Sequence, residues 1–169
     1  MIGVLLRSDG KGDWELAHEL LDVAGTEGTP SHLCDLLAEL RAHPNGDTYA
    51  YTLLSTIAAD RGPSALVAIV TALRGAEQAA DAYQLLTAVA RGSQACFISP
   101  IVRQLSETDA TWLIEALTAE RSEMDISTVR GMLAYGSCPH YVALLSPPQA
   151  RTRALDMPSV PAPPAFVGA

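Results

Sequence analysis

Apolar doublets recur along the chain at intervals of about 16 residues, which is the length of one short helix and a turn. They are Leu20-Leu21, Leu36-Leu37, Leu53-Leu54, Ile69-Val70, Leu85-Leu86, Ile101-Val102, Ala116-Leu117 and Met132-Leu133. Two intervals make a helix hairpin of about 32 residues, which lies within the range of known helical repeats. The pattern therefore predicts an all-α fold, a right-handed stack of antiparallel helix hairpins with about four repeats.

The breaks between doublets set the expected boundaries. We predict helices over residues 13–24, 31–42, 47–60, 64–74, 76–91, 95–105, 107–120 and 125–136, and a short terminal helix over 139–145. Pro100 is an exception, because either Ser99 caps a short helix that begins at the proline or the helix bends there. The domain boundaries that follow are an N-terminal lead-in over 1–12, the helical repeat domain over 13–146 and an extended proline-rich tail over 147–169.

Polar residues mark the predicted helix starts. Asp13, Asp47 and Asp125 can cap exposed amides, as aspartate often does at a helix N-terminus. Pro30 and Pro63 fit a helix entry, where the missing amide hydrogen costs little.

Arginines mark the predicted ends of the first helix in each hairpin. Arg61, Arg91 and Arg121 recur at equal spacing, and Gly62 and Gly92 follow the first two. An arginine in the last turn suits the helix dipole, and we expect glycine to supply a left-handed residue after the helix.

One segment of the chain repeats in recognisable form. Residues 53–62, LLSTIAADRG, resemble residues 85–92, LLTAVARG, with a gap of two residues. With the doublets, this hairpin repeat over residues 13–136 resembles HEAT-like and tetratricopeptide-like helical solenoids, although the glycine that the tetratricopeptide pattern needs after Trp14 is missing. The resemblance implies the architecture and a role in binding proteins, and it transfers no functional residue.

The composition of the chain limits its expected partners and location. Apolar residues make up 49% of the chain, and the formal net charge is −8 with a pI of about 4.8. This acidity gives no attraction to phosphates, so we expect no nucleic acid partner, whereas basic proteins would be attracted. The apolar run from Ala65 to Leu73 is about half a membrane span, and three scattered cysteines do not make a disulfide framework. We expect a cytoplasmic protein without membrane contact, and the excess of arginine and alanine indicates a bacterial source.

The motifs for metal binding are incomplete. His18-Glu19 begins the zinc-protease pattern but lacks its second histidine, and Glu15 with His18 forms half of a di-iron site with no second half. His32 and Cys34 have zinc-ligand chemistry, as do Cys138 and His140, but the two pairs belong to distant repeats. We therefore expect no metal and no cofactor.

Charges divide between the two helices of each hairpin. The first helices hold most of the acids, whereas the second helices expose small residues and carry one arginine each, namely Arg41, Arg74, Arg103 and Arg130. One helix row of a solenoid often binds extended partners, and arginine pairs with carboxylates. The sequence thus predicts that these arginines bind a protein segment; alternatively, they only complement helix dipoles.

These observations favour a non-enzymatic protein–protein interaction module, an adaptor or scaffold that uses the second-helix row. The alternative is an acidic inhibitor or immunity-type protein that blocks a basic toxin or a nucleic-acid-binding enzyme through Glu15, Glu19 and Asp22. An enzyme without a recognisable motif ranks last, because no catalytic motif is present.

Overall fold

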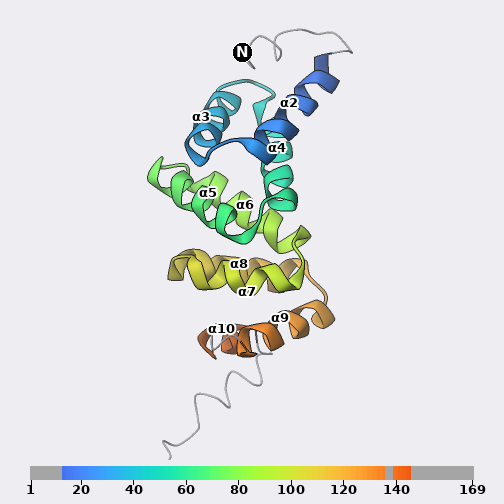
Figure 1. Cartoon of the computed structure of the whole chain (residues 1–169), viewed down its shortest axis with the longest axis vertical. Coiled ribbons are helices and arrows are strands. Elements are labelled where there is room, and N and C mark those ends of the chain that lie inside the picture. Colours follow the sequence, from blue (N-terminus) through green and yellow to red (C-terminus); the bar gives the residue numbers. More distant parts are fainter. Residues whose placement is uncertain (1–12, 136–138, 146–169) are drawn as a thin grey trace, which may run out of the picture.

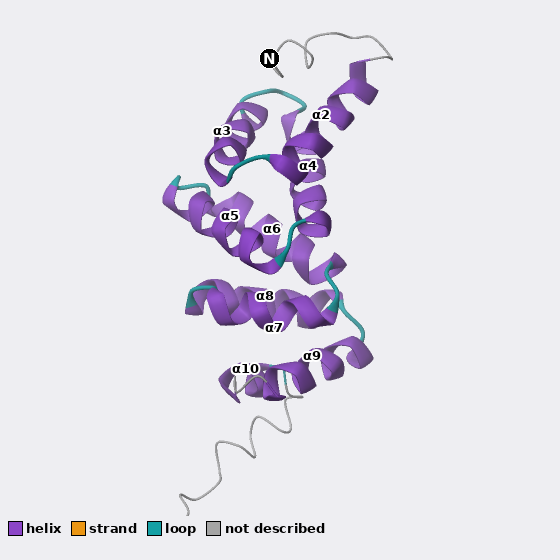
Figure 2. Ribbon diagram, in the orientation of Figure 1, coloured by secondary structure: helices purple, strands orange, loops and turns teal. Residues whose placement is uncertain are grey.

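The computed structural model describes residues 13–135 and 139–145, and this part of the chain is a stack of nine helices (Figure 1). They are α2 (Asp13–Glu27), α3 (Pro30–Arg41), α4 (Gly46–Asp60), α5 (Pro63–Gly75), α6 (Ala79–Gly92), α7 (Ala95–Gln104), α8 (Glu107–Glu120), α9 (Glu123–Tyr135) and α10 (Pro139–Leu144). The described residues contain no strand (Figure 2), which confirms the all-helical prediction for them. The predicted lead-in over 1–12 and the proline-rich tail lie outside the described residues.

The helices form two rows that run down the stack. In the first row, α2, α4, α6 and α8 each pack against the next member, and α10 continues the row by packing on α8 and α9. In the second row, α3, α5, α7 and α9 do the same. Between the rows, α3 packs on α4, α5 on α6 and α7 on α8. Helices α3, α5 and α7 therefore each rest on the first-row helix that follows in the chain and on the next helix of their own row.

The core lies between the rows and is built from the doublets. Leu53 and Leu85 are 0% exposed, and the residue after each is as deeply buried. The predicted doublets in α8 and α9 are less regular, because Ala116 and Met132 are only half-buried. In α8 the buried pair is instead Leu113-Ile114, one turn earlier. The helix period allows such a shift, since a residue one turn away faces nearly the same direction.

Two of the three aspartates predicted to cap a helix lie inside the helix instead. Asp47 lies in the first turn of α4 after the cap residue Asn45, and Asp125 lies inside α9. For α9 the capping oxygen belongs to Ser122, which accepts from the Asp125 amide at 3.3 Å and donates to its carboxylate at 2.8 Å. The Ser122 hydroxyl thus caps the Asp125 amide, and the Asp125 carboxylate accepts the hydrogen of the same hydroxyl.

The prediction that glycine supplies a left-handed residue after these helices is wrong. No glycine among the described residues has a positive φ. Helices α4, α6 and α8 are each followed by an extended residue, namely Arg61 (ψ 138°), Ser93 (ψ 145°) and Arg121 (ψ 157°). Gly92 is still helical, and Gly62 precedes α5 as its N-cap. An extended residue turns the chain directly into the next helix, so no left-handed residue is needed.

Helix α7 resolves the alternatives at Pro100. The helix begins at Ala95 and continues through the proline to Gln104, so Ser99 is not a cap. Proline has no amide hydrogen and cannot donate to the carbonyl of Cys96 one turn earlier. The α7 backbone is therefore one hydrogen bond short in its first turns.

The burial of the doublets makes a stability prediction. Leu86→Ala should lower the free energy of unfolding by about 2–5 kcal/mol, because Leu86 is 0% exposed and truncation leaves a cavity. Urea denaturation followed by circular dichroism measures this. The control Met124→Ala, at a side chain 80% exposed, should stay within about 0.5 kcal/mol of the wild type. Equal stability of the two variants would show that the core has been assigned incorrectly.

Candidate binding surfaces

Arg41, at the end of α3, forms hydrogen bonds with side chains of first-row helices. Its guanidinium donates to Asp81 of α6 at 2.5 and 3.0 Å and to Asp47 of α4 at 2.7 Å. It also donates to Gln84 at 2.7 Å. Burial alone would lower the pKa of Arg41, but the hydrogen bonds that Arg41 donates to Asp81 and Asp47 outweigh burial and raise the pKa. Arg41 thus ties the second row to two helices of the first.

Arg74 repeats this arrangement one hairpin further along. Its Nε donates to the buried carboxylate of Asp109 in α8 at 2.9 Å, and its Nη2 donates to the same oxygen. The guanidinium carbon lies 4.1 Å from the ring centroid of Tyr83, within cation–π range. Both arginines predicted to bind a partner at this end of the row therefore have intramolecular partners.

The other two predicted arginines differ from each other. Arg130 is partly buried and donates to the Leu145 carbonyl at 2.8 Å and to Glu123 at 3.2 Å. Arg103 is exposed, and its Nη2 donates to the hydroxyl of Ser99, one turn earlier in α7, at 3.2 Å. Within residues 13–135 and 139–145, Arg103 forms no ion pair with a carboxylate. It is the predicted arginine that remains most available to a partner.

Arg103 lies in a groove of about 410 Å³ between α7 and α9, which we call the α7–α9 groove. Its lining includes Ser99, Pro100, Arg103, Thr128, Met132 and Tyr135. Tyr135 is 96% exposed and supplies an aromatic surface at the rim. The groove thus combines a cation, hydroxyl groups and apolar surface on the second row.

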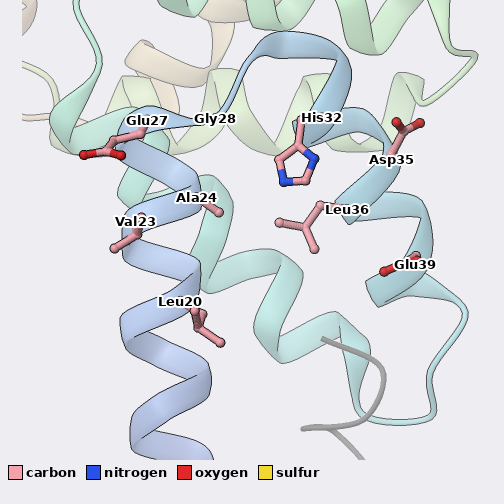
Figure 3. A pocket seen from close by; sticks show the side chains of 9 residues that line it. All are labelled: Leu20, Val23, Ala24, Glu27, Gly28, His32, Asp35, Leu36 and Glu39. Carbon is pink, nitrogen blue, oxygen red and sulfur yellow. The ribbon is translucent and has the colours of Figure 1, made fainter. Parts of the chain in front are cut away.

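A second groove, of about 590 Å³, lies between α2 and α3 at the other end of the stack, and we call it the α2–α3 groove (Figure 3). Leu20 and Ala24 approach it from α2, and His32 and Leu36 extend into it from α3 (Figure 3). Val23 adds an apolar side chain that is 54% exposed. The carboxylates on its rim belong to Glu27, Asp35 and Glu39. The groove therefore has apolar walls and an acidic rim.

The alternative acidic face on α2 is also formed. Glu15, Glu19 and Asp22 are exposed, and their spacing places them on one side of the helix. Asp22 accepts a hydrogen bond of 3.0 Å from the Thr56 hydroxyl of α4. All three carboxylates are thus exposed on α2, and that of Asp22 also joins α2 to α4.

An aromatic pair on the first row was missed by the sequence analysis. Tyr83 of α6 and Trp112 of α8 have ring centroids 4.4 Å apart, and they line a groove of about 410 Å³ with Glu107 and Glu115. The two rings come from different hairpins and share no local pattern, so only the stacking of α6 on α8 brings them together.

Carbonyl groups at the ends of two first-row helices accept hydrogen bonds from the arginine that follows the next first-row helix. Arg61, after α4, donates to Gly25 at 2.6 Å and to Gly28 at 2.7 Å at the end of α2. Arg121, after α8, donates to the carbonyls of Ala90 and Ser93 at the end of α6. These arginines satisfy acceptors that a helix leaves unpaired at its C-terminus.

Arg91 departs from the predicted series of three arginines. It lies inside α6, and the C-cap position belongs to Ser93, whose hydroxyl donates to the Ala58 carbonyl of α4 at 3.4 Å. Arg91 instead pairs with Glu120 through two hydrogen bonds of 2.8 and 2.9 Å. These bonds hold the pKa of Glu120 below its ordinary value.

The histidines and cysteines with zinc-ligand chemistry were not expected to bind a metal. Within the described part of the chain, no group of three or more histidine, cysteine, aspartate or glutamate side chains could hold a metal. His32 is exposed whereas Cys34 is buried, and Cys138 lies outside the described residues. Burial, with the charges of Asp35 and Asp81, raises the pKa of the Cys34 thiol. No described helix is long and apolar enough to cross a membrane.

Comparison of the chain with protein-family models, curated proteins and solved structures finds no match. The packing of the described helices is compatible with a helical-repeat architecture, because the same helix–helix contacts recur along the stack.

The two aspartates that pair with Arg41 allow a prediction with a matched control. Asp81→Asn should lower the free energy of unfolding by about 1.5–3 kcal/mol, since it removes a charge-assisted bond at a side chain only 7% exposed. Asp47→Asn should cost less than about 1 kcal/mol, because that carboxylate is 86% exposed. Both aspartates lie in the first turn of a helix, so dipole effects are similar. Equal losses in urea denaturation would contradict the assignment.

The cysteines provide a second prediction. In a Cys138→Ser background, Ellman's reagent should modify Cys96 at least about tenfold faster than Cys34, because Cys34 is buried and less of its thiol is ionised. Replacing Cys96 with serine should remove the fast phase, and replacing Cys34 should leave it. Two phases of the same rate would show that Cys34 is accessible.

Proposed function

We propose that the chain is a non-enzymatic interaction module, an adaptor or scaffold, that binds an acidic protein segment on its second row. The observation that carries the proposal is Arg103, an exposed arginine in the α7–α9 groove that has no carboxylate partner among the described side chains. Arg41 and Arg74 hold the rows together, so Arg103 is the arginine best placed for a partner.

The α7–α9 groove offers the chemistry that an acidic segment needs. The guanidinium of Arg103 can form two parallel hydrogen bonds with a carboxylate. Gly131 is exposed and has no side chain, so a peptide backbone can approach it, while Tyr135 and Met132 offer apolar contact area. A HEAT-like or tetratricopeptide-like solenoid is the corresponding proposal for the repeat type, and protein binding is the usual role of such repeats.

The alternative proposal is an acidic inhibitor of a basic protein. It is favoured by Glu15 and Glu19, whose exposed carboxylates lie together on α2. This proposal requires partner affinity to depend on these carboxylates and not on Arg103, so one set of variants distinguishes the two.

A random peptide library tests the proposal. Dodecapeptides displayed on phage are selected on the wild type, and the most enriched one is synthesised and titrated by fluorescence anisotropy. We expect enrichment in aspartate and glutamate, and Arg103→Gln should weaken binding by at least about tenfold, because an interfacial charge pair is lost.

The matched control is Ala119→Glu, which makes the same change in net charge at an exposed position on α8. It should bind as the wild type does. Failure to enrich any acidic peptide, or unchanged affinity of the acidic peptide for Arg103→Gln, would contradict the proposal. Basic peptides that lose affinity in a Glu15→Gln, Glu19→Gln variant would favour the inhibitor instead.

A further inference from the structure

The α2–α3 groove lies where the repeat geometry would place another second-row helix. Helix α3 packs on α4 and α5, α5 packs on α6 and α7, and α7 packs on α8 and α9. A helix one step earlier in this series would pack on α2 and α3. Among the described residues no helix occupies that position, and the groove is lined by these two helices (Figure 3).

The burial of equivalent residues supports this relation. Leu20 is the first residue of its doublet, as Leu53 and Leu85 are in α4 and α6. Leu53 and Leu85 are 0% exposed, in helices that pack on second-row neighbours α3 and α5. Leu20 is only half-buried and lines the groove. The first turns of α2 are similarly uncovered, since Leu16 is 46% exposed.

The groove chemistry specifies what kind of helix would fit. Leu20, Ala24 and Leu36 form apolar walls, so the occupant needs an apolar face. Glu27 borders the groove on α2, and Asp35 and Glu39 border it on α3. Three carboxylates around an apolar groove favour lysine or arginine on the flanks of an incoming helix and disfavour acidic ones.

We propose that the α2–α3 groove binds a basic amphipathic helix of another protein, which extends the second row by one member. The second-row helices α3, α5 and α7 have 12, 13 and 10 residues, so three turns suffice to fill the position. This site is separate from the α7–α9 groove and has the opposite charge preference. It goes beyond the proposed function by assigning a second kind of partner.

Two labelled helical peptides of about 12 residues test the proposal with the full chain. Both are hydrocarbon-stapled and carry leucines at positions i, i+3, i+4 and i+7; one has lysines on both flanks and the other has glutamates. In fluorescence anisotropy the lysine helix should bind at least about tenfold more tightly than the glutamate helix, and added salt should weaken it. Equal affinity for the two helices, or no saturable binding of the lysine helix, would overturn the proposal.

Variants place the binding in the groove. Neutralising the rim with Glu27→Gln, Asp35→Asn and Glu39→Gln should weaken the lysine helix about tenfold. The control triple Asp60→Asn, Glu77→Gln and Glu115→Gln removes the same charge at exposed positions elsewhere and should bind nearly as the wild type does. Equal weakening by both triples would show that only the overall charge matters and would overturn the site.

A second matched pair tests the apolar walls. Val23→Asn should weaken binding several-fold because it removes an apolar side chain from the groove, whereas Met124→Asn, at an exposed methionine on α9, should not. Circular dichroism checks that each variant remains helical. Unchanged affinity in Val23→Asn would contradict docking between α2 and α3.

Two rival occupants are outcomes of the same titrations. The chain's own residues 1–12 include Leu5, Leu6 and Arg7. Binding of the lysine helix only after Leu5→Ser and Leu6→Ser would overturn the proposal in favour of this segment. Dimerisation that Val23→Asn abolishes would overturn it in favour of a second copy. Arg103→Gln should bind the lysine helix normally, so failure of the acidic-segment proposal is distinguishable from failure of this one.

Discussion

The stack depends on how the unpaired carbonyl groups at the helix ends are satisfied. Short helices have many ends, and each C-terminus leaves up to four acceptors without an intrahelical donor. The residue after a first-row helix reaches back to the preceding first-row helix, with Arg61 serving α2, Ser93 serving α4 and Arg121 serving α6. The same bonds that satisfy these carbonyls also fix the spacing between neighbouring hairpins.

A second set of contacts holds the two rows together. Arg41 and Arg74 leave the ends of second-row helices and meet buried aspartates in the first turns of α6 and α8. Each pair places a cation and a carboxylate where both helix dipoles favour them. Because the stack uses these arginines for itself, the surface left for partners is smaller than the row of four arginines indicates. Among the described residues, Arg103 is the member of this row that forms no ion pair with a carboxylate.

The helices were predictable from the sequence because their signals are local. The doublet period, Pro30 and Pro63 are all read within one helix and its flanks, and both prolines stand at the first position of their helices. The partners of Arg41 and Arg74 were not predictable, since they lie in helices separated by a whole hairpin. The α2–α3 groove was equally hidden, because it depends on which helix faces remain uncovered after stacking.

Among the described helices α2 is the end member of the first row, and this position has a consequence for local stability. Helix α2 packs chiefly on α4, whereas α4 and α6 have first-row neighbours on both sides. In a structure held by nearest-neighbour contacts, a terminal helix opens at a lower free energy than an inner one. The amides of α2 are therefore expected to exchange with solvent by fraying that leaves the rest of the stack intact. Any molecule that covers its apolar side would suppress this fraying and stiffen that end of the protein.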